Sequence, residues 1–232
     1  MSQWRWKIAQ SFEILWWKRY LKDKPKEAYL QWKMQYWRNF LHDIQLGHLL
    51  DISKSQKYIL DAGCGPAGIF TVLDNHSVIG LDPLMEAYTK NVSQFVMGDY
   101  KYTEFLNQSI ESFEGFSLFD YIFCLNAINH VENLKKAVEV LVKSTKDDGT
   151  LIISVDAHRS KILQRIFAAL PGDILHPHQY TLEQYQSLFK SQGIEVSHVV
   201  LKKREPIFDY YVLVLKKIKA EKFASKESLR NL

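Results

Sequence analysis

Residues 60–68 read LDAGCGPAG and place three glycines in the spacing G-x-G-x-x-G, at Gly63, Gly65 and Gly68. This spacing is typical of a strand-to-helix turn whose backbone comes close to a nucleotide. The glycines alone do not distinguish NAD from another nucleotide. The residues around them therefore have to identify the ligand.

Polar side chains end the short apolar runs that we expect to be strands. In chain order they are Asp61, Asp82, Asp99, Asn126 and Asp156. In an open parallel sheet the ligand binds outside the carboxyl ends of the strands. We therefore expect four acids and one amide to surround a single pocket.

The acids favour a cationic nucleotide over NAD. Asp61, two residues before the first glycine, would repel a pyrophosphate lying over the turn, and Pro66 removes one of the backbone N–H groups that a phosphate needs. S-adenosylmethionine has no phosphate and carries a sulfonium and an ammonium, which an acid attracts. Asp82, 21 residues beyond Asp61, suits the ribose of either cofactor. Asp99 would accept a hydrogen bond from the adenine amino group.

Seven apolar runs predict the sheet. Five of them, at 58–60, 77–81, 95–97, 119–125 and 149–155, alternate with helical stretches. This order predicts a doubly wound, mostly parallel sheet with helices on both faces, an α/β fold. The gap between the last two runs, 194–200 and 209–215, is too short for a helical crossover, so we expect these two strands to be antiparallel neighbours.

Two amphipathic helices, at about 3–21 and 26–50, precede the first strand. All six tryptophans and nine Lys or Arg residues, against three acids, fall within the first 40 residues. The expected domains are a helical extension at 1–54, a nucleotide-binding domain at 55–216 and a basic tail at 217–232. The acidic central part of the chain argues against a nucleic-acid partner.

Composition indicates a cytoplasmic protein. The chain has 232 residues, of which 47% are hydrophobic and 24% charged, and it has two cysteines. Such sparse cysteine favours a reducing compartment. No secretory signal and no apolar run near the roughly 20 residues of a membrane span are recognised.

Over residues 55–215 the chain resembles the class I S-adenosylmethionine-dependent methyltransferases that act on small molecules. Five ordered segments carry the resemblance: LDAGCGPAG, VIGLDPL, MGDY, FDYIFCLNAINHVENL and GTLIISV. It implies a Rossmann-like seven-stranded sheet with an antiparallel last strand. It also implies S-adenosylmethionine as the cofactor.

The resemblance also implies roles for individual residues. Asp61, Gly63 and Gly65 would hold the amino acid part of the cofactor. Asp82 would bind the ribose, and Asp99 would bind the adenine with Tyr100 nearby. The cofactor-binding set expected on this basis comprises Asp61, Gly63, Cys64, Gly65, Asp82, Pro83, Asp99, Tyr100 and Asn126.

Methyl transfer is an in-line displacement on an activated donor, so a base matters only when the acceptor is a protonated oxygen or nitrogen. His130, in NAINHVEN, is the candidate base, with loop fixing or packing on the cofactor as its other reading. His176 and His178 precede a helix expected to begin after Thr181, and they either fix that loop or contact the substrate. We expect no metal at this pair because a supporting set of acids is missing nearby.

Departures from related enzymes narrow the acceptor. Enzymes that methylate amino groups of bases usually have Asn or Asp followed by Pro-Pro and an aromatic, whereas residues 126–129 read NAIN. Magnesium-dependent catechol-type enzymes need an acid at Asn126 and an Asp-Asn pair where this chain has Asp156-Ala157. We therefore expect a small-molecule O, N or C acceptor, aromatic or lipophilic in character, and no metal.

Three interpretations of the tryptophan-rich helices remain open. They could form a lid whose aromatic lining, including Trp37, contacts a planar acceptor. They could simply attach the helices to the sheet. They could also lie on an anionic membrane, since Trp4, Trp16 and Trp17 have basic neighbours at Lys18 and Arg19.

Two other functions remain as alternatives to an active methyltransferase. One is a binding or scaffold protein that keeps the cofactor site without chemistry, and the weaker one is an NAD-dependent oxidoreductase. The intact glycine turn and three acids favour the enzyme.

Overall fold

The computed structural model describes residues 3–159 and 180–218. It begins with two helices, α1 (Gln3–Leu21) and α2 (Lys26–Asp43), followed by a short 3₁₀ turn, η1 (Gly47–Leu50). The two helices that we expected before the first strand are present, but the second ends at Asp43 and not near residue 50. None of the helices in the described ranges is both long enough and apolar enough to cross a membrane.

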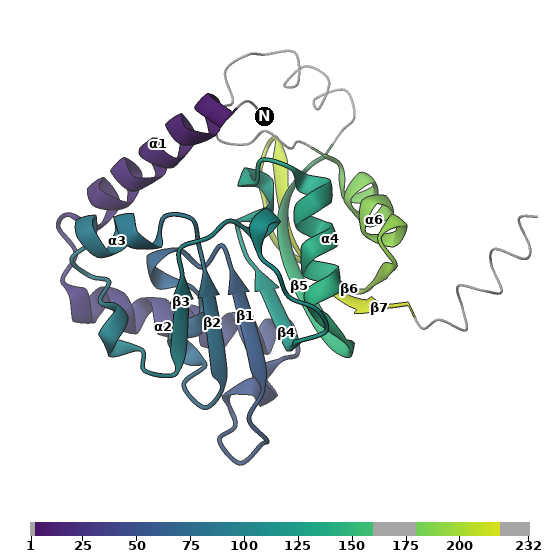
Figure 1. The fold of residues 1–232 in the computed structure, drawn as a ribbon, viewed down its shortest axis with the longest axis horizontal. Helices are drawn as coiled ribbons and strands as arrows, with labels where there is room; N and C mark the ends of the chain where they lie inside the picture. Colours follow the sequence, from purple (N-terminus) through teal and green to yellow (C-terminus); the bar gives the residue numbers. More distant parts are fainter. Residues whose placement is uncertain (1–2, 160–179, 219–232) are drawn as a thin grey trace, which may run out of the picture.

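A seven-stranded sheet forms the centre, in the order β3-β2-β1-β4-β5-β7-β6 (Figure 1). The first five strands pair in parallel, and β7 runs antiparallel to both β5 and β6. The predicted fold class and the antiparallel last pair are thus confirmed. The strands are β1 (Tyr58–Ala62), β2 (Ser77–Leu81), β3 (Thr103–Leu106), β4 (Phe119–Cys124), β5 (Thr145–His158), β6 (Ile194–Arg204) and β7 (Phe208–Lys217).

Helices cover both faces of the sheet, as Figure 1 shows. Neighbouring residues of β1 point to opposite faces, so Ile59 joins the cluster under α2 while Leu60 joins the cluster under α4 (Leu134–Ser144) and α6 (Leu182–Ser191). Such runs, buried on both sides, are typical of a parallel sheet between two helical layers.

The third strand was predicted in the wrong place. Residues 95–97 do not form a strand, and β3 lies at Thr103–Leu106 instead. The run FVM is apolar because Phe95 is buried in the core, whereas Val96 is largely exposed. β3 is the edge strand of the sheet and none of its residues is fully buried, so its sequence, TEFL, lacks a strong apolar signal.

Two of the crossovers contain no α-helix. Between β1 and β2 the chain makes two 3₁₀ turns, η2 (Gly65–Ala67) and η3 (Ile69–Val72), and between β3 and β4 it makes one, η5 (Ile110–Ser112). Only α3 (Met85–Asn91), between β2 and β3, and α4, between β4 and β5, are α-helical crossovers among the first five strands. The simple alternation of strand and α-helix predicted from the sequence is therefore incomplete.

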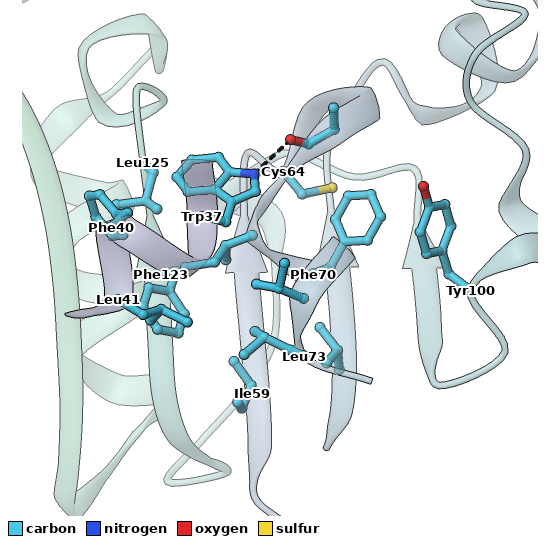
Figure 2. Packing of buried hydrophobic residues seen from close by; sticks show 14 of the residues in the cluster. Trp37, Phe40, Leu41, Ile59, Cys64, Phe70, Leu73, Tyr100, Phe123 and Leu125 are labelled. Carbon is cyan, nitrogen blue, oxygen red and sulfur yellow. Dashed lines mark hydrogen bonds between the residues drawn. The ribbon is translucent and has the colours of Figure 1, made fainter. Parts of the chain in front are cut away.

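The side chain of Trp37 attaches α2 to the sheet by packing and by one hydrogen bond. Its ring is buried among Phe40, Cys64 and Leu125, and its indole Nε1 donates a hydrogen bond of 3.0 Å to the carbonyl of Ala67 (Figure 2). The hydrogen bond joins α2 directly to the glycine turn, between Gly65 and Gly68. α2 is thus packed into the same hydrophobic core as the sheet.

Candidate functional site

Two adjoining cavities open at the carboxyl ends of β1, β2 and β4. We call one the glycine-turn cavity; its lining includes Trp17, Lys33, Trp37, Asp61, Gly63 and Cys64. The other we call the His130 cavity; its lining includes Gln10, Asp82, Pro83, Ser109, Glu111, Asn126 and His130. Most of the predicted site residues therefore do come together, at the edge of the sheet where an α/β fold binds its ligand.

The glycine turn is built on two left-handed backbone positions. Gly63 has φ of 71° and Gly65 has φ of 55°, values that residues with a side chain rarely adopt. The N–H groups of Gly63 and Cys64 donate to the carbonyl of Leu81 at 2.7 and 3.2 Å. The turn is thereby fastened to the end of β2, and its first N–H groups are already engaged.

Asp82 holds the next part of the turn. Its carboxylate accepts hydrogen bonds from the N–H groups of Gly65 at 2.9 Å and Leu84 at 2.8 Å, and only 5% of the residue is exposed. Burial, together with the nearby charge of Glu13, raises the pKa of Asp82 to about 7. A positive ligand in this cavity would relieve that unfavourable burial.

Asp61 folds back toward the chain after the glycines. Its carboxylate accepts the N–H group of Phe70 at 3.0 Å, and a Cβ at Gly68 would collide with it, so this position requires glycine. Burial raises the pKa of Asp61 to about 7, although Lys33 and the N–H donors oppose that shift. The N–H groups of Gly65 and Phe70 are therefore used by the protein's own carboxylates, and those of Gly63 and Cys64 by the carbonyl of Leu81.

Helix α1 contributes one face to the two cavities. Gln10, Glu13 and Trp17, spaced by three and four residues, all line them. Glu13 accepts a hydrogen bond of 2.7 Å from the hydroxyl of Tyr88, and burial raises the pKa of Glu13. No local sequence pattern singles out Glu13, because only the docking of α1 brings it beside Asp82.

Helix α2 places a cation in the glycine-turn cavity. The Nζ of Lys33 lies 4.5 Å from the ring centre of Trp37 and 4.8 Å from that of Tyr36. Burial lowers the pKa of Lys33 to about 8, while Asp61 acts in the opposite direction. Trp37, predicted as a substrate contact, lines this cavity rather than the His130 cavity.

The loop after β4 forms one wall of the His130 cavity. Asn126 has φ of 54°, and its N–H group donates to the hydroxyl of Ser154 at 2.7 Å. His130 lies at the end of a short 3₁₀ turn, η6 (Ile128–His130), and lines the cavity as the candidate base should. Glu111 braces this loop by accepting the N–H groups of Glu132 and Asn133 at 2.7 and 3.1 Å.

Asp99 and Tyr100 do not join this site. Because β3 begins only at Thr103, Asp99 precedes the strand instead of ending it, and its carboxylate pairs with Lys26 at 2.8 Å. Tyr100 packs against Phe70, with ring centres 4.9 Å apart, inside the hydrophobic core (Figure 2). The residues that follow β3 and do line the cavity are Ser109, Ile110 and Glu111.

Two further predictions concern residues away from the glycine turn, and a third concerns Cys64 within it. His176 and His178 lie outside the described residues. The helix expected after Thr181 is present as α6, and Gln184 accepts the N–H group of Thr181 at 2.9 Å. Cys64 is buried, and this burial with the neighbouring acids raises the pKa of its thiol well above the usual range, as suits a packing residue.

The cavities can hold a ligand that is positively charged at its centre. Four carboxylates, from Asp61, Asp82, Glu13 and Glu111, and one ammonium, from Lys33, line them. Within residues 3–159 and 180–218, no group of three or more His, Cys, Asp or Glu side chains is arranged to hold a metal ion.

Comparisons with known proteins agree with this geometry. Residues 32–199 match the protein family described as "Methyltransferase domain". Ubiquinone biosynthesis O-methyltransferase of Rickettsia felis is 34% identical over 109 residues, which are 46% of this chain and 43% of the relative. The match thus spans less than half the length of that relative.

Solved structures share the fold at low sequence identity. The 1,6-didemethyltoxoflavin-N1-methyltransferase of Burkholderia thailandensis, bound to 1,6-didemethyltoxoflavin and S-adenosylhomocysteine, superposes with a TM-score of 0.61 at 14% identity, over 94% of this chain and 92% of that one. Magnesium protoporphyrin IX methyltransferase of Synechocystis, bound to S-adenosylhomocysteine, gives 0.58 at 17% identity, over 89% and 94%.

Proposed function

The chain belongs to the methyltransferase-domain family of class I S-adenosylmethionine-dependent enzymes, and on that premise we propose that it methylates a small molecule. Family membership confirms the resemblance and the cofactor that the sequence indicated. The weaker alternative, an NAD-dependent oxidoreductase, is set aside.

The observation that carries the proposal is how the N–H groups of the glycine turn are used. Gly63 and Cys64 donate to Leu81, Gly65 donates to Asp82, and Pro66 has no N–H group to offer. A pyrophosphate would need these donors and would also meet the buried carboxylates. A sulfonium cofactor needs none of them and gains from the carboxylates.

The charges of the glycine-turn cavity suit the amino acid part of the cofactor. Lys33 would pair with the carboxylate of that part, and Asp61 would attract its ammonium group. Asp82 keeps lone pairs for the ribose hydroxyls after accepting its two N–H groups. Ser109 and Ile110, which follow β3 in the chain and line the His130 cavity, take the place of Asp99 as candidates beside the adenine.

The acceptor would share the His130 cavity with the ribose and the adenine, and it would lie against Val131 and His130, which combine apolar surface with an imidazole ring. The relatives named as O-methyltransferases favour a hydroxyl acceptor, and an aromatic, lipophilic hydroxyl compound fits this lining. For such an acceptor His130 would remove the hydroxyl proton.

Peripheral membrane contact is a further proposal, and it rests on the outer face of α1. Phe12, Leu15 and Trp16 are 53%, 59% and 55% exposed, and Lys18 and Arg19 follow them in sequence. Exposed apolar side chains with adjacent cations suit an anionic lipid surface. The same helix also lines the His130 cavity. A lipophilic acceptor would therefore enter this cavity from the lipid surface.

Calorimetry with S-adenosylmethionine and with NAD tests the proposed cofactor. We expect saturable binding of S-adenosylmethionine only, and we expect Asp82→Ala to abolish it because the turn and the ribose contact are lost together. Asp74→Ala, at an exposed position, is the matched control and should bind as the parent does. Binding of NAD in place of S-adenosylmethionine would refute the proposal.

A second measurement separates an active enzyme from a scaffold that only binds the cofactor. The protein is incubated with methyl-labelled S-adenosylmethionine and fractionated host metabolites. Transfer of label into an aromatic or lipophilic fraction supports the enzyme. Binding of the cofactor with no label in any fraction would support the scaffold.

A further inference from the structure

Three residues line both cavities: Glu13, Gly63 and Asn126. They therefore lie at the boundary between the glycine-turn cavity and the His130 cavity, which we call the passage. Glu13 is the one residue of the three whose side chain can ionise. Because Glu13 borders both cavities, its carboxylate would contact a ligand at the point where the ligand extends from one cavity into the other.

The chemistry of transfer places the donor sulfur at the same passage. This step rests on the proposed function, in which the amino acid part of the cofactor occupies the glycine-turn cavity and the acceptor shares the His130 cavity with the ribose and the adenine. In-line displacement requires the methyl group to point from one toward the other. The sulfonium, which carries that methyl group, therefore belongs between the two cavities.

Glu13 is held at this position by hydrogen bonds, and within the part of the chain that the structure describes its partners leave its charge uncompensated. Its carboxylate accepts the hydroxyl of Tyr88 at 2.7 Å and a hydrogen bond from the side chain of Trp17. Both donors are neutral. The neighbouring Asp82 is acidic and adds repulsion. A cation is the ligand that such a carboxylate lacks.

We propose that Glu13 is a positioning residue that distinguishes the charged methyl donor from its neutral product. During transfer the S–CH₃ bond breaks, a bond from the acceptor to the methyl group forms, and the electron pair of the broken bond stays on sulfur. The sulfonium becomes a neutral thioether, and the acceptor's proton passes to a base or to water. Glu13 then loses its positive partner, so the product is held less tightly than the donor.

Binding of three ligands to matched variants tests this role by calorimetry. The ligands are S-adenosylmethionine, S-adenosylhomocysteine, and sinefungin, in which an amine-bearing carbon replaces the sulfonium. For Glu13→Gln we expect the two cationic ligands to bind about tenfold more weakly, as for the loss of one partly screened charge pair, with little change for the neutral product. Glu27→Gln, the same change at an exposed site on α2, should alter none of the three.

Each outcome bears on a different claim. Equal weakening of all three ligands would make Glu13 a purely structural residue and overturn the inference. Failure of the unmodified protein to bind S-adenosylmethionine would instead refute the proposed function. If Glu13→Gln does not fold, Glu13→Asp keeps the charge and shortens the side chain. It should then weaken the cationic ligands selectively, and an unselective loss would again overturn the inference.

Discussion

Gly63 shows how much one residue can determine in this site. Its φ is 71°, and a Cβ there would collide with the Cβ of Ala127 in the loop after β4. We expect Gly63→Ala to lower the free energy of unfolding by about 2 kcal/mol or more, through overpacking and backbone strain. Urea denaturation measures the change.

Gly98→Ala is the control for Gly63→Ala. A Cβ at Gly98 meets no atom within 4 Å, so that variant should keep the stability of the parent. Similar unfolding midpoints for the two variants would contradict the expected strain at Gly63.

Site residues that are positioned by a local turn or by neighbouring parallel strands could be predicted from the sequence. Asp61, Gly63 and Gly65 belong to one turn, and Asp82 ends the neighbouring parallel strand, so sheet geometry alone brings them together. Glu13 and Lys33 reach the same cavity from α1 and α2. No local pattern encodes where a helix docks, and these two residues were therefore missed.

At the scale of elements, α1 presents two chemically different faces. Gln10, Glu13 and Trp17 face the cavities, whereas Phe12, Leu15 and Trp16 face outward. The triple change of Phe12, Leu15 and Trp16 to Ser should reduce sedimentation with anionic phosphatidylglycerol vesicles several-fold, because it removes the apolar contact with lipid.

The vesicle experiment has two controls. Zwitterionic phosphatidylcholine vesicles should retain little of either protein, since the basic residues next to the apolar face then have no partner. Calorimetry should show that the triple variant still binds S-adenosylmethionine. Undiminished binding of the triple variant to anionic vesicles would argue against α1 as the membrane-facing element.

Strands could be predicted from the sequence where burial gives them a continuous apolar run. β2 was placed at its observed bounds, because every residue from Val78 to Leu81 is buried and the run stands out from its flanks. β3 was misplaced because an edge strand needs little apolar sequence. The crossover between β1 and β2 was expected to be helical, but the fourteen residues between these strands form only 3₁₀ turns.

At the scale of the whole molecule, the buried acids link stability to pH. Asp61 and Asp82 have pKa values of about 7 in the folded protein, against an ordinary value near 3.8. Below pH 4 both are protonated in the folded and the unfolded chain, and their contribution is fully present. Between the unfolded value near 3.8 and the folded value of about 7, the unfolded chain has released these protons while the folded chain still holds them, so that stability is lost progressively as pH rises to about 7.

Thermal unfolding at pH 6 and pH 7.5 measures this linkage. The melting temperature of the cofactor-free protein should fall from pH 6 to pH 7.5. In the Asp82→Asn variant it should fall less. S-adenosylmethionine binds the ionised acids, so its stabilising effect should increase over the same interval, while Lys33, with a pKa of about 8, stays mostly charged. If S-adenosylmethionine raised the melting temperature by the same amount at both pH values, that result would contradict the linkage.

The position of Trp37, fixed by its hydrogen bond to Ala67, has a consequence for the fluorescence of the protein. Trp17 and Trp37 line the glycine-turn cavity, whereas Trp16 and Trp32 are 55% and 54% exposed. Indole emission depends on the polarity and the charges around the ring, so a sulfonium entering beside two of these rings would change their fluorescence and leave the exposed rings unaltered. The protein therefore carries its own spectroscopic reporter of whether the cavity is filled, with no need for an attached dye.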